Sequence, residues 1–182
     1  SRLGLEVPQG FKDCIKLEEI GNTYFGIQAY DRKSSISDRK INENYISIIY
    51  GADIVRFQYS IPNKYFNYLS ENIKSGGDLN VYSQDRIVIS QIGQSPKVGF
   101  CKKGILTSNT IYNLFLKDSR FSIKYILAIL NSQLIKSYWL SKYNDNKKKF
   151  PKIKGYQLKQ LPIKEISLEN QHPFIEKADQ ML

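Results

Sequence analysis

The residues of this sequence most able to do chemistry are lysines that gather in one stretch. Residues 141–164 hold eight lysines and one acid, so this stretch carries most of the formal net charge of +10. Ammonium groups neutralise phosphates, and the aromatic residues Tyr143, Phe150 and Tyr156 between the lysines suit sugar or base faces. The residues predicted to contact phosphate are Lys142, Lys147, Lys148, Lys149, Lys152 and Lys154. A solvated lysine loop is the alternative, because lysine is abundant throughout the chain.

A second group of polar side chains could read DNA bases. Arginine and lysine suit the major-groove edge of guanine, and glutamine suits that of adenine. Arg56 lies on the polar side of a predicted strand, and the other candidates lie in and around the polar loop that follows residue 30. The predicted base readers are Gln28, Arg32, Lys33 and Arg56. Each of them, taken alone, is also a common kind of surface residue.

The sequence contains no recognisable catalytic constellation. A Ser/His/Asp or Cys/His arrangement would need His172, the only histidine, and the two cysteines stand too far apart in sequence to suggest a zinc site. The sequence also lacks a phosphate-cradling glycine loop and an Asn-Pro-Pro-aromatic motif. Asp31 and Asp38 each precede a lysine by two residues, which leaves a magnesium-dependent nuclease open. We otherwise predict no catalytic residue, no metal ligand and no cofactor in this chain.

Two helices are predicted in the second half of the chain. Apolar residues recur every three or four positions over residues 122–143, which predicts a long amphipathic helix with Ser122 as its N-cap. Asn131 and Ser132 are expected to bend this helix without ending it. Residues 167–182 are read as the start of a truncated C-terminal helix, with Pro173 in its first turn.

The first half of the chain reads mainly as short strands. A short helical turn is predicted at residues 16–20, and residues 65–73 fit helix and strand equally. The predicted strands are residues 24–30, 55–60, 86–92, 97–101 and 110–116. Strands followed by helices indicate an α+β fold, with a mixed or antiparallel sheet, a long helix packed on it and a C-terminal helix. We expect one domain over residues 1–182, cut from a larger chain.

Composition limits the classes of protein that fit. The chain has 182 residues, of which 41% are hydrophobic and 13% aromatic, and this excludes wholesale disorder. It has no run of 18 apolar residues and no signal-peptide pattern, so a membrane span is not indicated and a cytoplasmic location is the default. Binding of the basic stretch to an anionic membrane surface or an acidic protein stays open.

Six short phrases follow one another in a defined order. They are Gly-Ile-Gln at 26–28, Ile-Tyr-Gly-Ala-Asp-Ile-Val-Arg-Phe at 49–57, Arg-Ile-Val-Ile-Ser at 86–90, Leu-Ala-Ile-Leu-Asn-Ser at 127–132, Phe-Pro-Lys-Ile at 150–153 and Leu-Lys-Gln-Leu-Pro-Ile at 158–163. Together they resemble the TaqI-like C-terminal specificity domain and, more loosely, the target-recognition domains of type I restriction specificity subunits. The family's usual small residue and glycine after Gly-Ile are Ala29 and Tyr30 here.

The resemblance implies a DNA target-recognition domain that does no catalysis itself. Its parent would be an adenine-N6 DNA methyltransferase of a restriction–modification system, with a type IIG enzyme that also cuts DNA as one form. S-adenosylmethionine would bind an upstream methyltransferase domain of the same chain. The domain would face that neighbour across double-stranded DNA, read the target in the major groove and help to hold the duplex while the adenine is flipped out. A domain of a type I specificity subunit remains an alternative.

Overall fold

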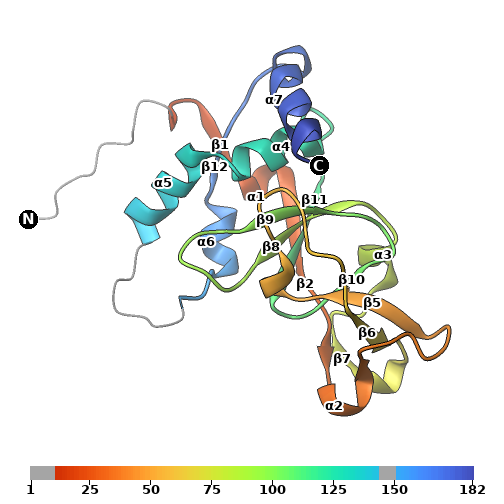
Figure 1. Ribbon diagram of the computed structural model, residues 1–182. Coiled ribbons are helices and arrows are strands. Elements are labelled where there is room, and N and C mark those ends of the chain that lie inside the picture. The colour runs from red at the N-terminus through yellow and green to blue at the C-terminus, as the bar shows by residue number, and fades with distance from the viewer. Residues whose placement is uncertain (1–10, 144–150) are drawn as a thin grey trace, which may run out of the picture.

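The structure, a computed structural model, describes residues 11–143 and 151–182 (Figure 1). It has an α+β fold in which strands dominate the first two thirds of the chain and helices the last third, so the predicted class is confirmed. Two four-stranded sheets carry most of the strands, and two-stranded sheets join more distant segments. Among the described residues, no helix is long and apolar enough to cross a membrane.

The central sheet is antiparallel. Its strands, in spatial order, are β2 (Gly21–Phe25), β11 (Ile111–Leu116), β8 (Arg86–Ser90) and β9 (Val98–Cys101). Both faces of β8 are buried: Ile87 and Ile89 point to the main core under the helices, whereas Val88 joins a smaller cluster on the opposite face. This alternation follows from the two-residue period of a strand. The strands predicted at 86–92, 97–101 and 110–116 are therefore confirmed.

The second sheet is mixed and forms a separate lobe. Its strands, in spatial order, are β10 (Leu106–Thr107), β5 (Tyr45–Ile49), β6 (Lys64–Asn67) and β4 (Ile36–Ser37), with β10 parallel to β5. Two small sheets pair β3 (Gln28–Ala29) with β7 (Ile73–Ser75), and β1 (Cys14–Lys16) with β12 (Pro162–Lys164). The short helices are α1 (Leu17–Ile20), α2 (Arg32–Ser35), α3 (Leu79–Tyr82), α6 (Gly155–Lys159) and the 3-10 turns η2 (Gly51–Asp53) and η3 (Ser70–Asn72).

Two strand predictions need correction. Residues 24–30 do not form one strand, because β2 ends at Phe25 and β3 begins at Gln28. Residues 55–60 form a loop. Phe57 has a positive φ of 71°, its N–H donates to the Val98 carbonyl and its carbonyl accepts from the Phe100 N–H, so it lies against β9 as a single bridge. The alternation that predicted a strand here reflects one buried aromatic side chain in a loop.

The long helix predicted over residues 122–143 is two helices. α4 (Ile123–Leu130) ends at Asn131 and α5 (Gln133–Tyr143) begins two residues later, so Asn131 and Ser132 end the helix rather than bend it. Asn131 Nδ2 donates to the Leu127 carbonyl at 2.9 Å, and the Ser132 hydroxyl accepts from the Ile135 N–H at 3.2 Å. The Ser132 hydroxyl thus satisfies an N–H that a continuous helix would pair with the Asn131 carbonyl, and the Asn131 amide adds a second donor to a carbonyl that also accepts from the Asn131 N–H.

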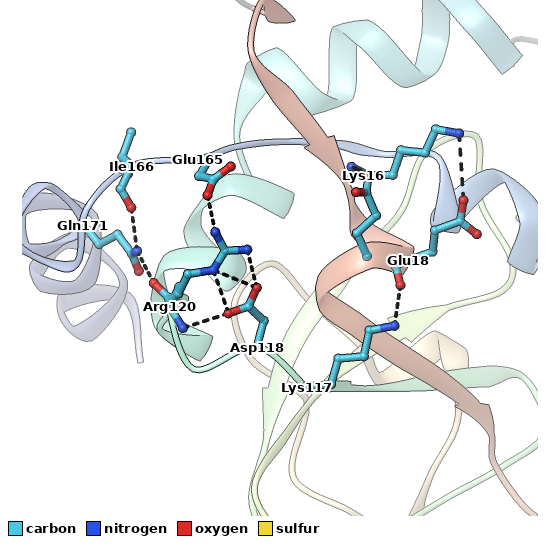
Figure 2. A network of polar contacts seen from close by, with 9 residues as sticks. Lys16, Glu18, Lys117, Asp118, Arg120, Glu165, Ile166 and Gln171 are labelled. Atoms are coloured by element: carbon cyan, nitrogen blue, oxygen red, sulfur yellow. Dashed lines mark hydrogen bonds and ion pairs between the residues drawn. The ribbon is translucent and has the colours of Figure 1, made fainter.

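The C-terminal helix α7 (Leu168–Met181) confirms the predicted element and corrects its start. Pro173 is the sixth residue of the helix and not in its first turn, so one backbone hydrogen bond is lost inside the helix. Packing on α4 compensates: the Phe174 ring meets Tyr125 edge-on at 5.3 Å, and the buried Gln171 side chain accepts from the Ser122 N–H where α4 begins. Figure 2 shows Gln171 with its two other partners, the carbonyls of Arg120 and Ile166.

Candidate nucleic-acid interface

Segments far apart in sequence meet at the turn of residues 108–110. The N–H of Asn109 donates to the Ile27 carbonyl at 2.8 Å, and the N–H of Ser108 donates to the Ile49 carbonyl at 2.9 Å. The Thr110 hydroxyl accepts from the Gly51 N–H at 2.9 Å, and the Thr110 carbonyl accepts from the Gln91 N–H at 2.8 Å. The 108–110 turn thus holds together the first loop, the Gly51 turn and the loop after β8.

Glycines allow the backbone to approach this closely. A Cβ on Gly26 would lie 2.1 Å from the Ser108 carbonyl oxygen and 2.4 Å from the Thr107 oxygen. Gly76, with a φ of +74°, would place a Cβ 2.2 Å from the Gly26 oxygen. Because backbone atoms cannot move aside as flexible side chains can, any larger residue at these positions would separate the segments. The Gly-Ile-Gln phrase is therefore explained by packing of the first loop against the 108–110 turn.

The predicted base readers of the first loop lie beside this turn. Arg32 opens α2 and is exposed, and its Nη2 donates to the Asn109 side-chain oxygen at 3.0 Å. Lys33 follows on α2 and is exposed, whereas Gln28 lies half-buried in β3. Asp31 is the N-cap of α2: its carboxylate accepts from the Lys33 N–H at 2.9 Å, and this bond, with others, lowers the pKa of Asp31.

The described part of the basic stretch reaches the same turn through Gln91. The Ile153 N–H donates to the Gln91 carbonyl at 2.8 Å, and the Gln91 Nε2 donates to the Asn109 carbonyl at 2.7 Å. Lys152 and Lys154 flank Ile153 and are exposed. A chain of three hydrogen bonds thus connects Arg32 with the segment of these two lysines. It runs from Arg32 to Asn109, from Asn109 to Gln91 and from Gln91 to Ile153.

The remaining predicted phosphate residues divide into two cases. Lys142 lies at the end of α5, and its ammonium group donates to the Tyr138 hydroxyl at 2.8 Å and lies over the rings of Tyr138 and Tyr143. These contacts raise the pKa of Lys142, the hydrogen bond to Tyr138 being the first cause. Lys147, Lys148 and Lys149 lie outside the described residues.

Arg56 lies apart from the 108–110 turn. Its guanidinium donates twice to the Asn131 carbonyl, from Nε at 3.3 Å and from Nη2 at 2.9 Å, and so caps the end of α4. It also lines a groove of about 290 Å³ together with Lys97 and Lys136. The structure does not bring Arg56 together with Gln28, Arg32 and Lys33.

Asn109 and Gln91 are the residues that sequence reasoning missed. Both are half-buried polar residues in loops between strands, and neither belongs to a motif or to a charge cluster. Their importance comes from long-range hydrogen bonds, which no local pattern predicts.

The two aspartates considered for a nuclease have separate partners. Asp31 caps α2, and Asp38 pairs with the Lys64 ammonium group on β6. Within residues 11–143 and 151–182, no group of three His, Cys, Asp or Glu side chains could hold a metal ion.

Residues 46–163 match the family described as the TaqI-like C-terminal specificity domain, which is more than half of the chain. The chain belongs to this family. It is a target-recognition domain of the restriction–modification class, and the resemblance stated from the sequence is confirmed. The match begins after the first loop, so Gln28, Arg32 and Lys33 lie outside the matched range.

Solved structures share the fold of this specificity domain. The HsdS subunit from Thermoanaerobacter tengcongensis is 17% identical with a TM-score of 0.58, over 98% of this chain and 39% of that one. The type IIL restriction–modification enzyme MmeI in complex with DNA is 10% identical with a TM-score of 0.62, over 90% of this chain and 28% of that one. The type IIG restriction endonuclease BpuSI is 12% identical with a TM-score of 0.59, over 92% of this chain and 26% of that one. The chain spans less than half the length of each. No curated protein matches it.

Proposed function

We propose that this specificity domain binds double-stranded DNA and reads its target sequence for a restriction–modification methyltransferase, without catalysing a reaction itself. The observation that carries the proposal is the link from Arg32 through Asn109 and Gln91 to the segment of Lys152 and Lys154. Phosphate contacts fix the position of a protein on the duplex, and base contacts can form only in that position. A base-reading cation must therefore be held at a fixed distance from the phosphate-binding lysines. The similarity in fold to MmeI, whose structure is a complex with DNA, supports the same partner.

The finer assignment concerns the parent enzyme. We place the methyl donor, S-adenosylmethionine, and the adenine-N6 chemistry in an upstream domain of the same chain. The glycines of this domain support that division, because a Cβ on Gly26, Gly51 or Gly76 would meet protein atoms within 3.0 Å. These three glycines face the protein's own chain and form no open cradle for a cofactor. A parent that also cuts DNA, as type IIG enzymes do, and a type I specificity subunit both fit this domain.

The phosphate role is tested by the salt dependence of DNA affinity. In wild type, log K for a duplex should fall linearly with log salt concentration. The variant Lys152→Ala/Lys154→Ala should lower that slope by about 1.8 if each lysine neutralises one phosphate. The variant Lys103→Ala/Lys177→Ala, which removes two exposed lysines elsewhere, serves as the charge-matched control. An equal slope in the two double variants would contradict the role of the 152–154 segment. A triple Ala variant of Lys147, Lys148 and Lys149 extends the test to the rest of the basic stretch.

The reading role is tested by sequence preference. Arg32→Ala should flatten the discrimination among randomised duplexes by about 1–3 kcal/mol at one base pair, because one bidentate base contact contributes that much. It should change the salt slope by no more than one phosphate contact. Arg39→Ala, an exposed arginine of the following loop, is the control and should retain the wild-type preference. Unchanged preference in the Arg32 variant would remove Arg32 from the base readers.

A further inference from the structure

The groove at the junction of α4 and α5 is the strongest unassigned feature of the described surface. It has a volume of about 290 Å³ and lies between the loop that leads into β9 and the start of α5. Three cations line it, Arg56, Lys97 and Lys136, and none of the described residues of its lining carries a carboxylate. Such a one-sign groove attracts an anion, and nothing within the lining neutralises it.

Polar groups complete the groove between these cations. Its lining also includes the polar residues Ser95, Asn131, Ser132 and Gln133. Hydroxyl and amide groups of this kind donate to phosphate oxygens in protein–DNA complexes. α5, which has 11 residues, begins at this edge, and the dipole of a helix also favours negative charge at its N-terminus.

Arg56 is held in place on one side of the groove. Two of its nitrogen atoms, Nε and Nη2, donate to the Asn131 carbonyl, and its guanidinium lies 5.3 Å from the centre of the Phe57 ring. Phe57 is itself bonded to β9 through its N–H and its carbonyl. Guanidinium carries five N–H donors, so the Nη1 group, which makes no hydrogen bond within the described residues, can serve an anion. The cation is thus preorganised before an anion arrives.

The groove continues the surface of the proposed phosphate-binding segment. The Gly93 N–H donates to the Pro151 carbonyl at 3.1 Å, and Ile92 and Lys152 form a β-bridge. The same loop, two to four residues further on, supplies Ser95 and Lys97 to the groove. The loop between β8 and β9 therefore connects the cations of the 151–154 segment with those of the α4–α5 groove. A DNA strand carries one phosphate per nucleotide, so successive phosphates of one strand can contact both groups of cations.

We propose that the groove binds a backbone phosphate of the DNA beyond the phosphates held by Lys152 and Lys154, with Arg56, Lys97 and Lys136 as its cations. This inference rests on the proposed DNA-binding function and deepens it. Arg56 then positions the duplex and carries no sequence information, in contrast to its predicted role as a base reader.

The test compares two double variants. Lys97→Ala/Lys136→Ala should reduce the slope of log K against log salt by up to about 1.8, since each phosphate contact on B-DNA contributes about 0.9. Sequence preference should stay as in wild type. Lys103→Ala/Lys177→Ala removes the same charge elsewhere and should leave the slope near that of wild type. Lys103 follows β9 and Lys97 precedes it, so the comparison spans the two ends of one strand. Lys97→Arg/Lys136→Arg keeps both charges and should retain the slope.

Each outcome decides between the two proposals. If both Ala variants show the same slope while wild type still binds DNA in a salt-dependent way, the groove proposal is overturned and the proposed function stands. If wild type shows no salt-dependent duplex binding, both fail. If poly-glutamate of equal charge competes as well as duplex, and competes less well against the Lys97→Ala/Lys136→Ala variant, the groove fits an acidic protein and the phosphate assignment is overturned. Since Lys97 and Lys136 are exposed, Trp139 fluorescence during thermal unfolding should confirm that the variants fold.

Discussion

Arg86 illustrates how a single residue ties the two sheets together. Its side chain has no exposed surface, and its Nε donates to the Asn113 side-chain oxygen at 2.7 Å while its Nη2 donates to the Ile105 carbonyl at 2.5 Å. The guanidinium also lies 5.2 Å from the centre of the Tyr82 ring. Within the described residues, all hydrogen-bond acceptors of Arg86 are neutral oxygens, and they hold this cation between the central sheet and the second lobe. Burial lowers the pKa of Arg86.

The sharpest prediction at the residue scale concerns Gly26. Gly26→Ala should lower the free energy of unfolding by about 1–3 kcal/mol, because the added Cβ would lie 2.1 Å from a backbone oxygen that cannot turn away. The variant should also discriminate less between DNA sequences, because the first loop would move away from the 108–110 turn. Urea unfolding followed by the fluorescence of Trp139 measures the stability.

Gly155→Ala is the matched control for this change. A Cβ on Gly155 would lie 3.5 Å from the Tyr112 ring, an ordinary contact, and Gly155 opens α6. The variant should be neutral or more stable by about 0.4–1 kcal/mol, because alanine restricts the unfolded chain. Equal losses from the two substitutions would contradict the close-approach argument.

At the scale of elements, α7 is docked by one buried amide. Gln171 Oε1 accepts from the Ser122 N–H at 2.9 Å. Its Nε2 donates to the Arg120 carbonyl at 2.8 Å and to the Ile166 carbonyl at 3.1 Å (Figure 2). The ion pair between Lys124 on α4 and Asp179 on α7 lies at the surface, where such pairs contribute little. The buried amide therefore fixes the position of α7 on α4 more than this ion pair does.

Gln171→Leu should lower the free energy of unfolding by about 2–4 kcal/mol. The leucine is similar in size but leaves the Ser122 N–H and the carbonyls of Arg120 and Ile166, which lie in part-buried bonds, without their partner. Each buried group without a partner costs about 1–3 kcal/mol. His172→Leu, at the exposed neighbouring position, should change stability by less than about 0.5 kcal/mol. Denaturant unfolding of both variants gives the comparison, and a Gln171 variant as stable as the His172 variant would refute the docking role.

At the scale of the whole molecule, separate apolar clusters on the two sheets share a response to alkaline pH. Burial raises the pKa of Cys101, in the cluster behind the central sheet, to about 11 from 9.0. Burial likewise raises the pKa of Tyr82, in the second lobe, to about 12 from 10.0. Both groups are neutral in the folded state over a wider range than in the unfolded chain.

The contribution of Cys101 and Tyr82 to stability should therefore be constant below about pH 9 and fall as pH rises from 9 towards 12. A raised folded-state pKa means that the unfolded chain ionises first, so stability is lost above the unfolded value, by about 2–3 kcal/mol for each group. Cys101→Ala should remove the part of the loss between pH 9 and 11. Urea unfolding at a series of pH values measures this, and an unchanged pH profile in the variant would contradict the assignment to Cys101.

The sequence by itself determined the elements whose signals are local. The strands at residues 86–92, 97–101 and 110–116 follow from runs of β-branched and aromatic residues, and the existence of the C-terminal helix follows from the spacing of its apolar residues. The order of six short phrases was enough to identify the family. Each of these signals lies within a few neighbouring residues, where backbone preference and side-chain period act directly.

Only the tertiary structure decided which residues work together. The Asn131 carbonyl at the end of α4 accepts from Arg56, which is 75 positions away in the sequence. Phe57 lies in a loop whose hydrogen bonds to β9 no local pattern predicts. Arg32 meets Asn109 only because glycines let the first loop press against the 108–110 turn. Hydrogen bonds between distant segments depend on how sheets and loops pack, and packing energy is not encoded in any short window of sequence.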